Sequence, residues 1–223
     1  MKKRLFFHAA GKMLAGLILM GLLLFWPAGT LAYPGAWRLL GALFVPMLIL
    51  GAFLLAKSPA LLEKRLANRE NEGTQQRVVA LSGIMFLAGF IVAGLDFRFG
   101  WTPLPGWLSI AATAVFLLGY GMYAEVMREN AYLSRTVEVQ ENQKVIDTGL
   151  YGVVRHPMYT ATILMFLSMP AVLGSALAFV IFLAYPVLIA ARIRNEETVL
   201  EAGLDGYADY KKRVKYRLIP FVW

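Results

Sequence analysis

Four long apolar runs dominate the first 127 residues and decide what kind of protein this chain can be. They cover residues 14–32, 39–56, 78–95 and 104–127, and each is close to the ~20 residues that a helix needs to cross ~30 Å of hydrocarbon. Charged residues make up only 16% of the chain, against roughly a quarter in soluble domains. The sequence therefore predicts an all-α polytopic membrane protein and excludes a soluble enzyme.

The positive charges are distributed unevenly between the loops. All Lys and Arg residues except Arg38 and Arg98 fall in the N-terminal segment and in residues 57–77, 128–156 and 192–217. By the positive-inside rule we expect these segments, and so both termini, to be cytoplasmic, with the protein in the cytoplasmic (inner) membrane. Topology thus accounts for the net charge of +8, and we expect membrane lipids as partners and no nucleic acid.

Residues suited to metal binding or thiol chemistry are scarce. Cysteine is absent, and histidine occurs only as His8 and His156, which excludes disulfides, a cysteine nucleophile and a cage of thiolate or imidazole metal ligands. We therefore expect no metal site. The first 128 residues show no polar constellation, so function is expected to begin in the polar stretch that follows Arg128.

A small polar hairpin is predicted within that stretch. Residues 136–140 and 143–147 have β-prone patterns, and Glu141 and Asn142 between them favour a turn. Gly149 then permits a tight turn before Arg155, His156 and Pro157.

A helical hairpin is predicted for the next apolar segment. Residues 157–191 would form a single helix ~50 Å long, which is much more than one membrane thickness. Pro170, Gly174 and Pro186 interrupt it, so we expect a turn at residues 169–175.

The expected fold is therefore four N-terminal transmembrane helices plus a C-terminal helical hairpin, with a small cytoplasmic cofactor-binding region. We divide the chain into a transmembrane region, residues 1–128, and a C-terminal catalytic region, residues 129–223.

The number of membrane crossings between residues 157 and 191 decides which charged residues can meet. A hairpin returns Glu196 and Glu197 to the membrane face that holds Arg155 and His156, whereas a single crossing would leave them on opposite faces. Pro157 suits the first turn of a helix, and cationic side chains beside a helix N-terminus favour an anion. The sequence predicts one site built from these charged residues, closed by the amphipathic tail.

The same residues carry a family resemblance over about residues 130–223. The motifs are, in order, Gly149-x-Tyr151-x-x-x-Arg155-His156-Pro157-x-Tyr159, Arg192-x-x-x-Glu196-Glu197-x-x-Leu200, Tyr207-x-x-Tyr210 and Arg217-Leu218-Ile219-Pro220. In this arrangement the chain resembles the isoprenylcysteine carboxyl methyltransferase family, within a wider group that includes phospholipid methyltransferases. The resemblance implies a methyltransferase that binds S-adenosylmethionine near the cytoplasmic face and admits a lipophilic small molecule or lipid from the bilayer.

The resemblance also implies roles for individual residues. Arg155 and His156 can hold the carboxylate or the adenine edge of S-adenosylmethionine, Glu196 or Glu197 can accept hydrogen bonds from its hydroxyls or ammonium, and aromatic rings can wall it. The expected cofactor-binding residues are Gly149, Tyr151, Arg155, His156, Tyr159, Glu196 and Glu197, and the expected catalytic residues are Arg155, Glu197 and Arg217.

Two other functions stay open at this point. Sterol reductases share a similar Arg-His-Pro-x-Tyr stretch and acidic pair, so an NADPH-dependent membrane reductase is the first alternative. A non-enzymatic transporter or scaffold is the second. The tail tyrosines Tyr207, Tyr210 and Tyr216 are expected to be interfacial anchors rather than ligands.

Overall fold

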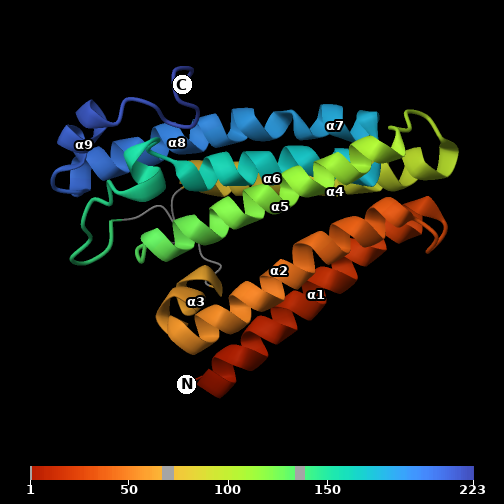
Figure 1. Ribbon diagram of the computed structural model, residues 1–223, viewed down its shortest axis with the longest axis horizontal. Helices are drawn as coiled ribbons and strands as arrows, with labels where there is room; N and C mark the ends of the chain where they lie inside the picture. Colours follow the sequence, from red (N-terminus) through yellow and green to blue (C-terminus); the bar gives the residue numbers. More distant parts are fainter. Residues whose placement is uncertain (1, 67–72, 134–138) are drawn as a thin grey trace.

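The computed structural model describes residues 2–66, 73–133 and 139–223 as a bundle of helices (Figure 1). In chain order the helices are α1 (Lys2–Ala28), α2 (Pro34–Lys57), α3 (Pro59–Leu66), α4 (Gly73–Phe99), α5 (Gly106–Glu129), a 3-10 turn η1 (Gly149–Gly152), α6 (Pro157–Leu173), α7 (Ala176–Phe182), α8 (Ala184–Gly203) and α9 (Tyr207–Arg213). The first two helices form an antiparallel pair beside the layer that α4 to α8 make (Figure 1).

Five helical segments are long and apolar enough to cross a membrane. They are Lys3–Ala28, Pro34–Lys57, Gln75–Phe99, Gly106–Glu129 and Ala176–Gly203. Four of them contain most of the four apolar runs of the sequence, and the fifth joins α7 to α8. The shorter apolar helix α6 completes the predicted C-terminal hairpin.

The hairpin turns where the sequence predicts it. Helix α6 ends at Leu173, and Gly174 follows with φ 80°, a left-handed conformation that glycine adopts without strain. The Ser175 hydroxyl then accepts the Ala178 N–H over 3.1 Å and caps α7. Pro186 lies in the first turn of α8, where its missing N–H is tolerated, so the chain breaks between α7 and α8 just before it.

A polar cluster around Asp96 lies at the end of the bundle where the turns after α4 and α6 meet. The Asp96 carboxylate accepts the Thr102 N–H and the Thr102 hydroxyl, each over 2.6 Å, and also accepts from the Ser175 hydroxyl. Nearby, the Tyr33 hydroxyl donates to the Leu173 carbonyl over 2.8 Å. The expectation that the first 128 residues hold no polar constellation is therefore wrong.

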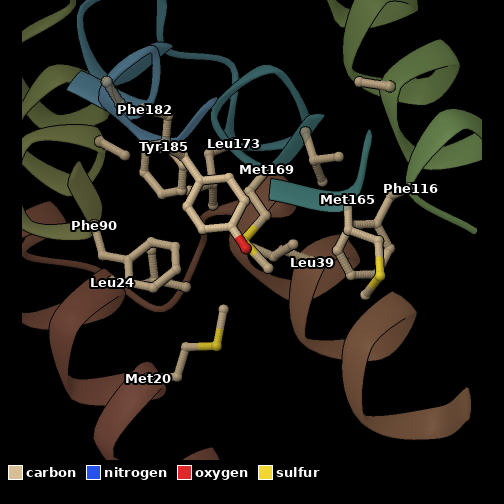
Figure 2. Packing of buried hydrophobic residues seen from close by; sticks show 14 of the residues in the cluster. Met20, Leu24, Leu39, Phe90, Phe116, Met165, Met169, Leu173, Phe182 and Tyr185 are labelled. Carbon is tan, nitrogen blue, oxygen red and sulfur yellow. The ribbon is translucent and has the colours of Figure 1, made fainter. Parts of the chain in front are cut away.

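The apolar core lies between the α1–α2 pair and the helices of the hairpin. Figure 2 shows Met20 and Leu24 of α1 facing Phe182 and Tyr185, with Met169 and Leu173 of α6 beside them. Helices α5 and α6 approach closely at Gly119, where a Cβ atom would lie 2.9 Å from Met165 Cγ and 3.1 Å from the Ala161 carbonyl oxygen. Small residues at such a position allow membrane helices to pack.

The predicted polar hairpin is only partly visible. The turn at Glu141 and Asn142 is present, with the Gln143 N–H bonded to the Gln140 carbonyl over 3.1 Å and Asn142 at φ 56°. Residues 134–138, in the first arm, lie outside the described residues, and residues 139–147 form no strand. Residues 139–147 lie beside η1 and α9 at one end of the bundle (Figure 1).

Candidate active site

The site residues gather where α6 begins and α8 ends. His156 directly precedes α6, and Arg192, Glu196 and Glu197 lie on α8. Because the helical hairpin folds back, residues about forty positions apart in the sequence meet at the same end of the bundle. The sequence prediction that these two charged groups share one face of the bundle therefore agrees with the arrangement of the chain.

Glu197 is the centre of a buried charge cluster. Its Oε1 accepts from Arg155 Nε over 2.8 Å and lies 3.3 Å from His156 Nε2. Its Oε2 accepts from Arg217 Nε over 2.9 Å and from Arg217 Nη2 over 2.8 Å. The side chain of Glu197 is 3% exposed and that of Arg155 is 4% exposed, so the pair is shielded from solvent and depends on this mutual neutralisation.

The segment 214–218, which we call the C-terminal strap, is held against the start of α6 by its main chain. Arg155 Nη1 donates to the Val214 and Lys215 carbonyls, each over 2.7 Å. The main-chain N–H groups of Arg155 and His156 donate to the Tyr216 and Arg217 carbonyls, respectively, each over 2.9 Å. The Thr160 hydroxyl donates to the Leu218 carbonyl over 2.9 Å. Five consecutive carbonyls thus close one side of the site.

Glu196 belongs to a second, separate group of contacts. Its Oε2 accepts from the Tyr159 hydroxyl over 2.5 Å, and the same hydroxyl accepts from Arg192 Nε over 2.8 Å. Helix α4 supports this stretch of α8, because Gln75 Nε2 donates to Asn195 Oδ1 over 2.7 Å. The two neighbouring glutamates therefore have different partners, although they are adjacent in the sequence.

A cavity opens beside these two groups, and we call it the polar cavity. Its lining residues are Asn130, Tyr132, Leu133, Gln143, Lys144, Val145, Ile146, Tyr151, Arg155, His156, Met158, Tyr159, Arg192, Glu196, Leu200, Leu204, Tyr207 and Tyr210. It therefore combines amide, cationic, acidic and aromatic side chains at the end of an apolar bundle.

Tyr151 forms part of the cavity wall and is protonated under ordinary conditions. Burial raises its pKa to about 12, although the hydrogen bond from Asn130 Nδ2 over 2.9 Å works in the other direction. Its own carbonyl accepts from the Tyr210 hydroxyl over 2.8 Å. Hydrogen bonds therefore hold both the hydroxyl and the main-chain carbonyl of Tyr151.

The structure separates the predicted site residues into two groups. Tyr151, Arg155, His156, Tyr159 and Glu196 line the polar cavity. The others, Gly149, Glu197 and Arg217, lie outside the described lining and support it from behind.

The backbone conformation of Gly149 and its close contact with Glu129 both require a glycine at this position. Its φ is 52°, and a Cβ atom there would lie 1.4 Å from Glu129 Oε1. Glu129 in turn accepts the Leu150 N–H over 3.1 Å. The glycine lets the carboxylate at the end of α5 reach the backbone of η1.

Two tail tyrosines are placed differently from the expectation. Tyr207 and Tyr210 are only 4% and 2% exposed, and both line the polar cavity, so their interpretation as interfacial anchors is wrong. They pack with Leu204 and Val214 in a small cluster of their own. The spacing Tyr207-x-x-Tyr210, one helical turn, is a signal that could have pointed to a shared inward face.

Sequence reasoning also left Arg192, Asn130 and residues 143–146 out of the site. Arg192 was recognisable only as the first residue of the Arg-x-x-x-Glu spacing, which puts it one turn before Glu196 on the same helix face. Asn130 and residues 143–146 had no such signal, because their position depends on how the polar stretch folds back over α6.

Comparison with known proteins places this region in a family. The model of the isoprenylcysteine carboxyl methyltransferase (ICMT) family matches residues 111–202, which include the start of α6 and all the site residues of α8. Over these residues the chain is similar to the ICMT family. The resemblance seen in the sequence motifs is therefore confirmed.

Three curated proteins are similar to parts of this chain. The mouse Delta(14)-sterol reductase TM7SF2 is 32% identical over 91 residues, 40% of this chain and 22% of that protein. The nickel-cobalt-cadmium resistance protein NccN of Alcaligenes xylosoxydans xylosoxydans is 29% identical over 108 residues, 48% of this chain and 49% of that protein. The cobalt-zinc-cadmium resistance protein CzcN of Cupriavidus metallidurans is 29% identical over 126 residues, 56% of either chain. The matches thus span at most about half the length of these relatives.

A solved structure supports the fold over nearly the whole chain. It is described as the eukaryotic intramembrane Ras methyltransferase ICMT, without a monobody. The TM-score is 0.59 at 21% sequence identity, and the match covers 96% of this chain and 77% of that one. The protein is therefore an all-α polytopic integral membrane protein, as its composition predicts.

Proposed function

We propose that this protein is a membrane-embedded S-adenosylmethionine-dependent methyltransferase that acts on a carboxylate or another nucleophile of a lipophilic substrate. The observation that carries the proposal is the polar cavity at the end of an apolar bundle, whose lining residues, apart from Leu204, Tyr207 and Tyr210, come from the region that the ICMT family model matches. A methyl-transfer site needs this combination, because a charged donor must meet a substrate dissolved in the bilayer.

The chemistry of the lining fits such a donor. S-adenosylmethionine presents a carboxylate, an ammonium, ribose hydroxyls and an adenine ring, and when bound it supplies an activated methyl group on a sulfonium. Arg155 and His156 offer cationic or hydrogen-bonding groups, Glu196 offers a carboxylate, and Tyr151 and Tyr159 offer aromatic faces. These five residues, with Gly149 and Glu197 behind them, form the proposed cofactor site.

The expected catalytic residues Arg155, Glu197 and Arg217 act mainly by positioning in this proposal. Glu197 fixes Arg155 and His156 through one oxygen and Arg217 through the other. Arg155 and His156 reach the cavity, whereas Glu197 and Arg217 hold them in place. Such fixed geometry is the main contribution a protein makes to an in-line group transfer.

The nature of the acceptor decides how much proton transfer the protein must perform. A carboxylate acceptor has a reference pKa near ~4 and needs no general base at neutral pH. An amine acceptor needs one, and His156 is the imidazole that lines the cavity. Burial of the site within the bundle also keeps water away from the donor.

The proposal extends to the chain as a whole. Residues 1–128 form the transmembrane scaffold, and residues 129–223 form the catalytic region. Both termini lie in the cytoplasm, the membrane is the cytoplasmic (inner) membrane, and the partners are a lipophilic small molecule or lipid and the surrounding lipids.

Calorimetry with the purified full-length protein in detergent tests the proposal directly. We expect saturable binding of S-adenosylhomocysteine and transfer of a labelled methyl group from S-adenosylmethionine into membrane lipid extracts. NADPH is the control ligand, and it should bind much more weakly. Failure to bind either adenosyl compound, in protein that still unfolds cooperatively, would refute the proposal.

An NADPH-dependent reductase is the second candidate, and one observation favours it. The mouse Delta(14)-sterol reductase TM7SF2 shares 32% identity over 91 residues. Tight NADPH binding with oxidation coupled to reduction of a lipid double bond would support this candidate, with Tyr159 as a proton donor. If neither nucleotide binds, a transporter or scaffold becomes the better hypothesis.

A further inference from the structure

Tyr207 is a buried aromatic residue at the start of α9 whose role the site has not yet explained. It is 4% exposed, and its ring centroid lies 5.8 Å from that of Tyr210. Its side chain lines the polar cavity together with Leu204 and Glu196. Tyr207 therefore lies at the edge of the polar cavity.

The hydroxyl of Tyr207 has no hydrogen-bond partner in the part of the chain that the structure describes, and it is closed off from solvent. Buried hydroxyls normally have a partner, because leaving one without a partner destabilises the fold. Phenylalanine would fill the same space without this cost. A bound ligand that forms a hydrogen bond with the Tyr207 hydroxyl would remove this cost.

Tyr210 provides a contrast within the same turn of helix. It lines the same cavity and is 2% exposed, but its hydroxyl donates to the Tyr151 carbonyl over 2.8 Å. The hydroxyl of Tyr210 therefore stabilises the fold, whereas the hydroxyl of Tyr207 forms no hydrogen bond with the described residues. The two residues form a matched pair for experiment.

The charges around Tyr207 restrict which ligand group it can meet. Burial raises the pKa of Tyr207 above its ordinary value, and the nearby Glu197 and Glu196 carboxylates raise it further, so the hydroxyl keeps its proton. A ligand carboxylate would be repelled by the two glutamates, and an ammonium can only donate to the oxygen of Tyr207, which leaves the proton of Tyr207 without an acceptor. A ligand hydroxyl meets both conditions, since it can accept from Tyr207 and donate to Glu196.

We propose that Tyr207 is a ligand-binding residue whose hydroxyl donates a hydrogen bond to a sugar hydroxyl of the bound methyl donor. This inference rests on the proposed function, because it takes the occupant of the polar cavity to be a nucleoside compound. Glu196 accepts from Tyr159 through one oxygen, and a carboxylate has capacity for further donors. The sugar hydroxyl would then bridge α8 and α9.

The test compares Tyr207→Phe with Tyr210→Phe in the full-length protein. Thermal unfolding without ligand and calorimetry with S-adenosylhomocysteine are measured for both variants and for the unaltered protein. We expect Tyr207→Phe to unfold at the same or a higher temperature and to bind about three- to tenfold more weakly, the loss expected for one neutral hydrogen bond. Tyr210→Phe should unfold at a lower temperature, because it loses its bond to Tyr151.

Ligands that lack one sugar hydroxyl locate the contact. With 2′-deoxy or 3′-deoxy S-adenosylhomocysteine, one of the two should bind Tyr207→Phe and the unaltered protein equally well, since the shared hydrogen bond is already missing. A loss of affinity that persists undiminished with both deoxy ligands overturns the assignment to a sugar hydroxyl.

The remaining outcomes separate this inference from the proposed function. If the unaltered protein binds S-adenosylhomocysteine and Tyr207→Phe binds it equally tightly, only the role of Tyr207 is refuted. If ligand-free Tyr207→Phe is destabilised as strongly as Tyr210→Phe, the hydroxyl serves the fold and the inference is again wrong. If the unaltered protein does not bind, the proposed function itself fails.

Discussion

Arg155 donates its Nε–H to Glu197 Oε1 over 2.8 Å, and both side chains are at least 96% buried. This pair joins Arg155, two positions before α6 begins, to the C-terminal half of α8, so it holds the two arms of the helical hairpin together at the site. Removing one partner of a buried ion pair leaves the other charge unpaired in a medium that solvates it poorly, and it costs far more than an exposed pair contributes.

Glu197→Gln should therefore destabilise the protein. We expect a loss of about 3–5 kcal/mol in the free energy of unfolding, since Arg155 and Arg217 both lose their counter-charge. Denaturant or thermal unfolding in detergent measures it. Glu201→Gln on the same helix is the control, because its pair with Lys211 is largely exposed and should contribute only about 0–1 kcal/mol. Equal stability of the two variants would contradict the structural role of Glu197.

Glu196→Gln and His156→Ala should weaken ligand binding. Loss of one charge-assisted hydrogen bond costs about 1.5–3 kcal/mol, or roughly ten- to hundredfold in affinity. Calorimetry with S-adenosylhomocysteine checks this, with Glu201→Gln again as the control. The assignment of both residues to the cofactor site fails if neither substitution changes the affinity.

Gly119→Val should loosen the contact between α5 and α6. The nearest atoms to an added Cβ are Met165 Cγ at 2.9 Å and the Ala161 carbonyl oxygen at 3.1 Å, so the helices must separate, at a cost of about 1–3 kcal/mol. Gly121→Val is the matched control, because no atom lies within 4 Å of a Cβ there. Thermal unfolding of the two variants should differ clearly, and similar melting temperatures would argue against this close approach.

Single cysteines introduced into the cysteine-free chain should report its orientation. We expect Trp101→Cys, in the loop after α4, to react with an impermeant reagent from outside the cell. Lys212→Cys and Glu141→Cys should react only after the membrane is opened, because basic segments are retained inside. Labelling of Glu141→Cys and Lys212→Cys from opposite sides would contradict the helical hairpin, whereas an exchange of sides at all three positions would contradict the orientation alone.

The helices and the hairpin could be predicted because they depend on quantities that a sequence displays. The length of residues 157–191, with Pro170 and Gly174 near its middle, exceeds one membrane thickness and therefore requires a turn. The turn then brings Glu197 back to Arg155. Composition and segment length were sufficient for this step, and no knowledge of side-chain packing was needed.

The assignment of the two glutamates could not be predicted in the same way. Glu196 and Glu197 are adjacent, and successive side chains on a helix point in directions about 100° apart. Which of them faces Tyr159 and which faces Arg155 depends on the rotation of α8 against α6. Helix rotation is fixed by packing along the whole length of both helices, so it cannot be read from a short motif.

Two other features were hidden for a related reason. Tyr207 precedes a run of Lys and Arg residues, a pattern typical of an interfacial anchor, but Val139 and Val145 from a distant segment pack against the cluster that contains it. Asp96 stands alone among apolar neighbours in the sequence, and its partners Thr102 and Ser175 come from two different turns. In both cases at least one contact comes from a residue far away in the chain, such as Ser175 for Asp96.

The C-terminal strap offers its carbonyl oxygens, rather than its side chains, to the start of α6. Every amino acid has that oxygen, so residues 214–216 can change identity without losing a single acceptor. The residue types at positions 214–216 therefore say little about whether the C-terminal strap is present. A chain with other side chains at these three positions can close the same site in the same way.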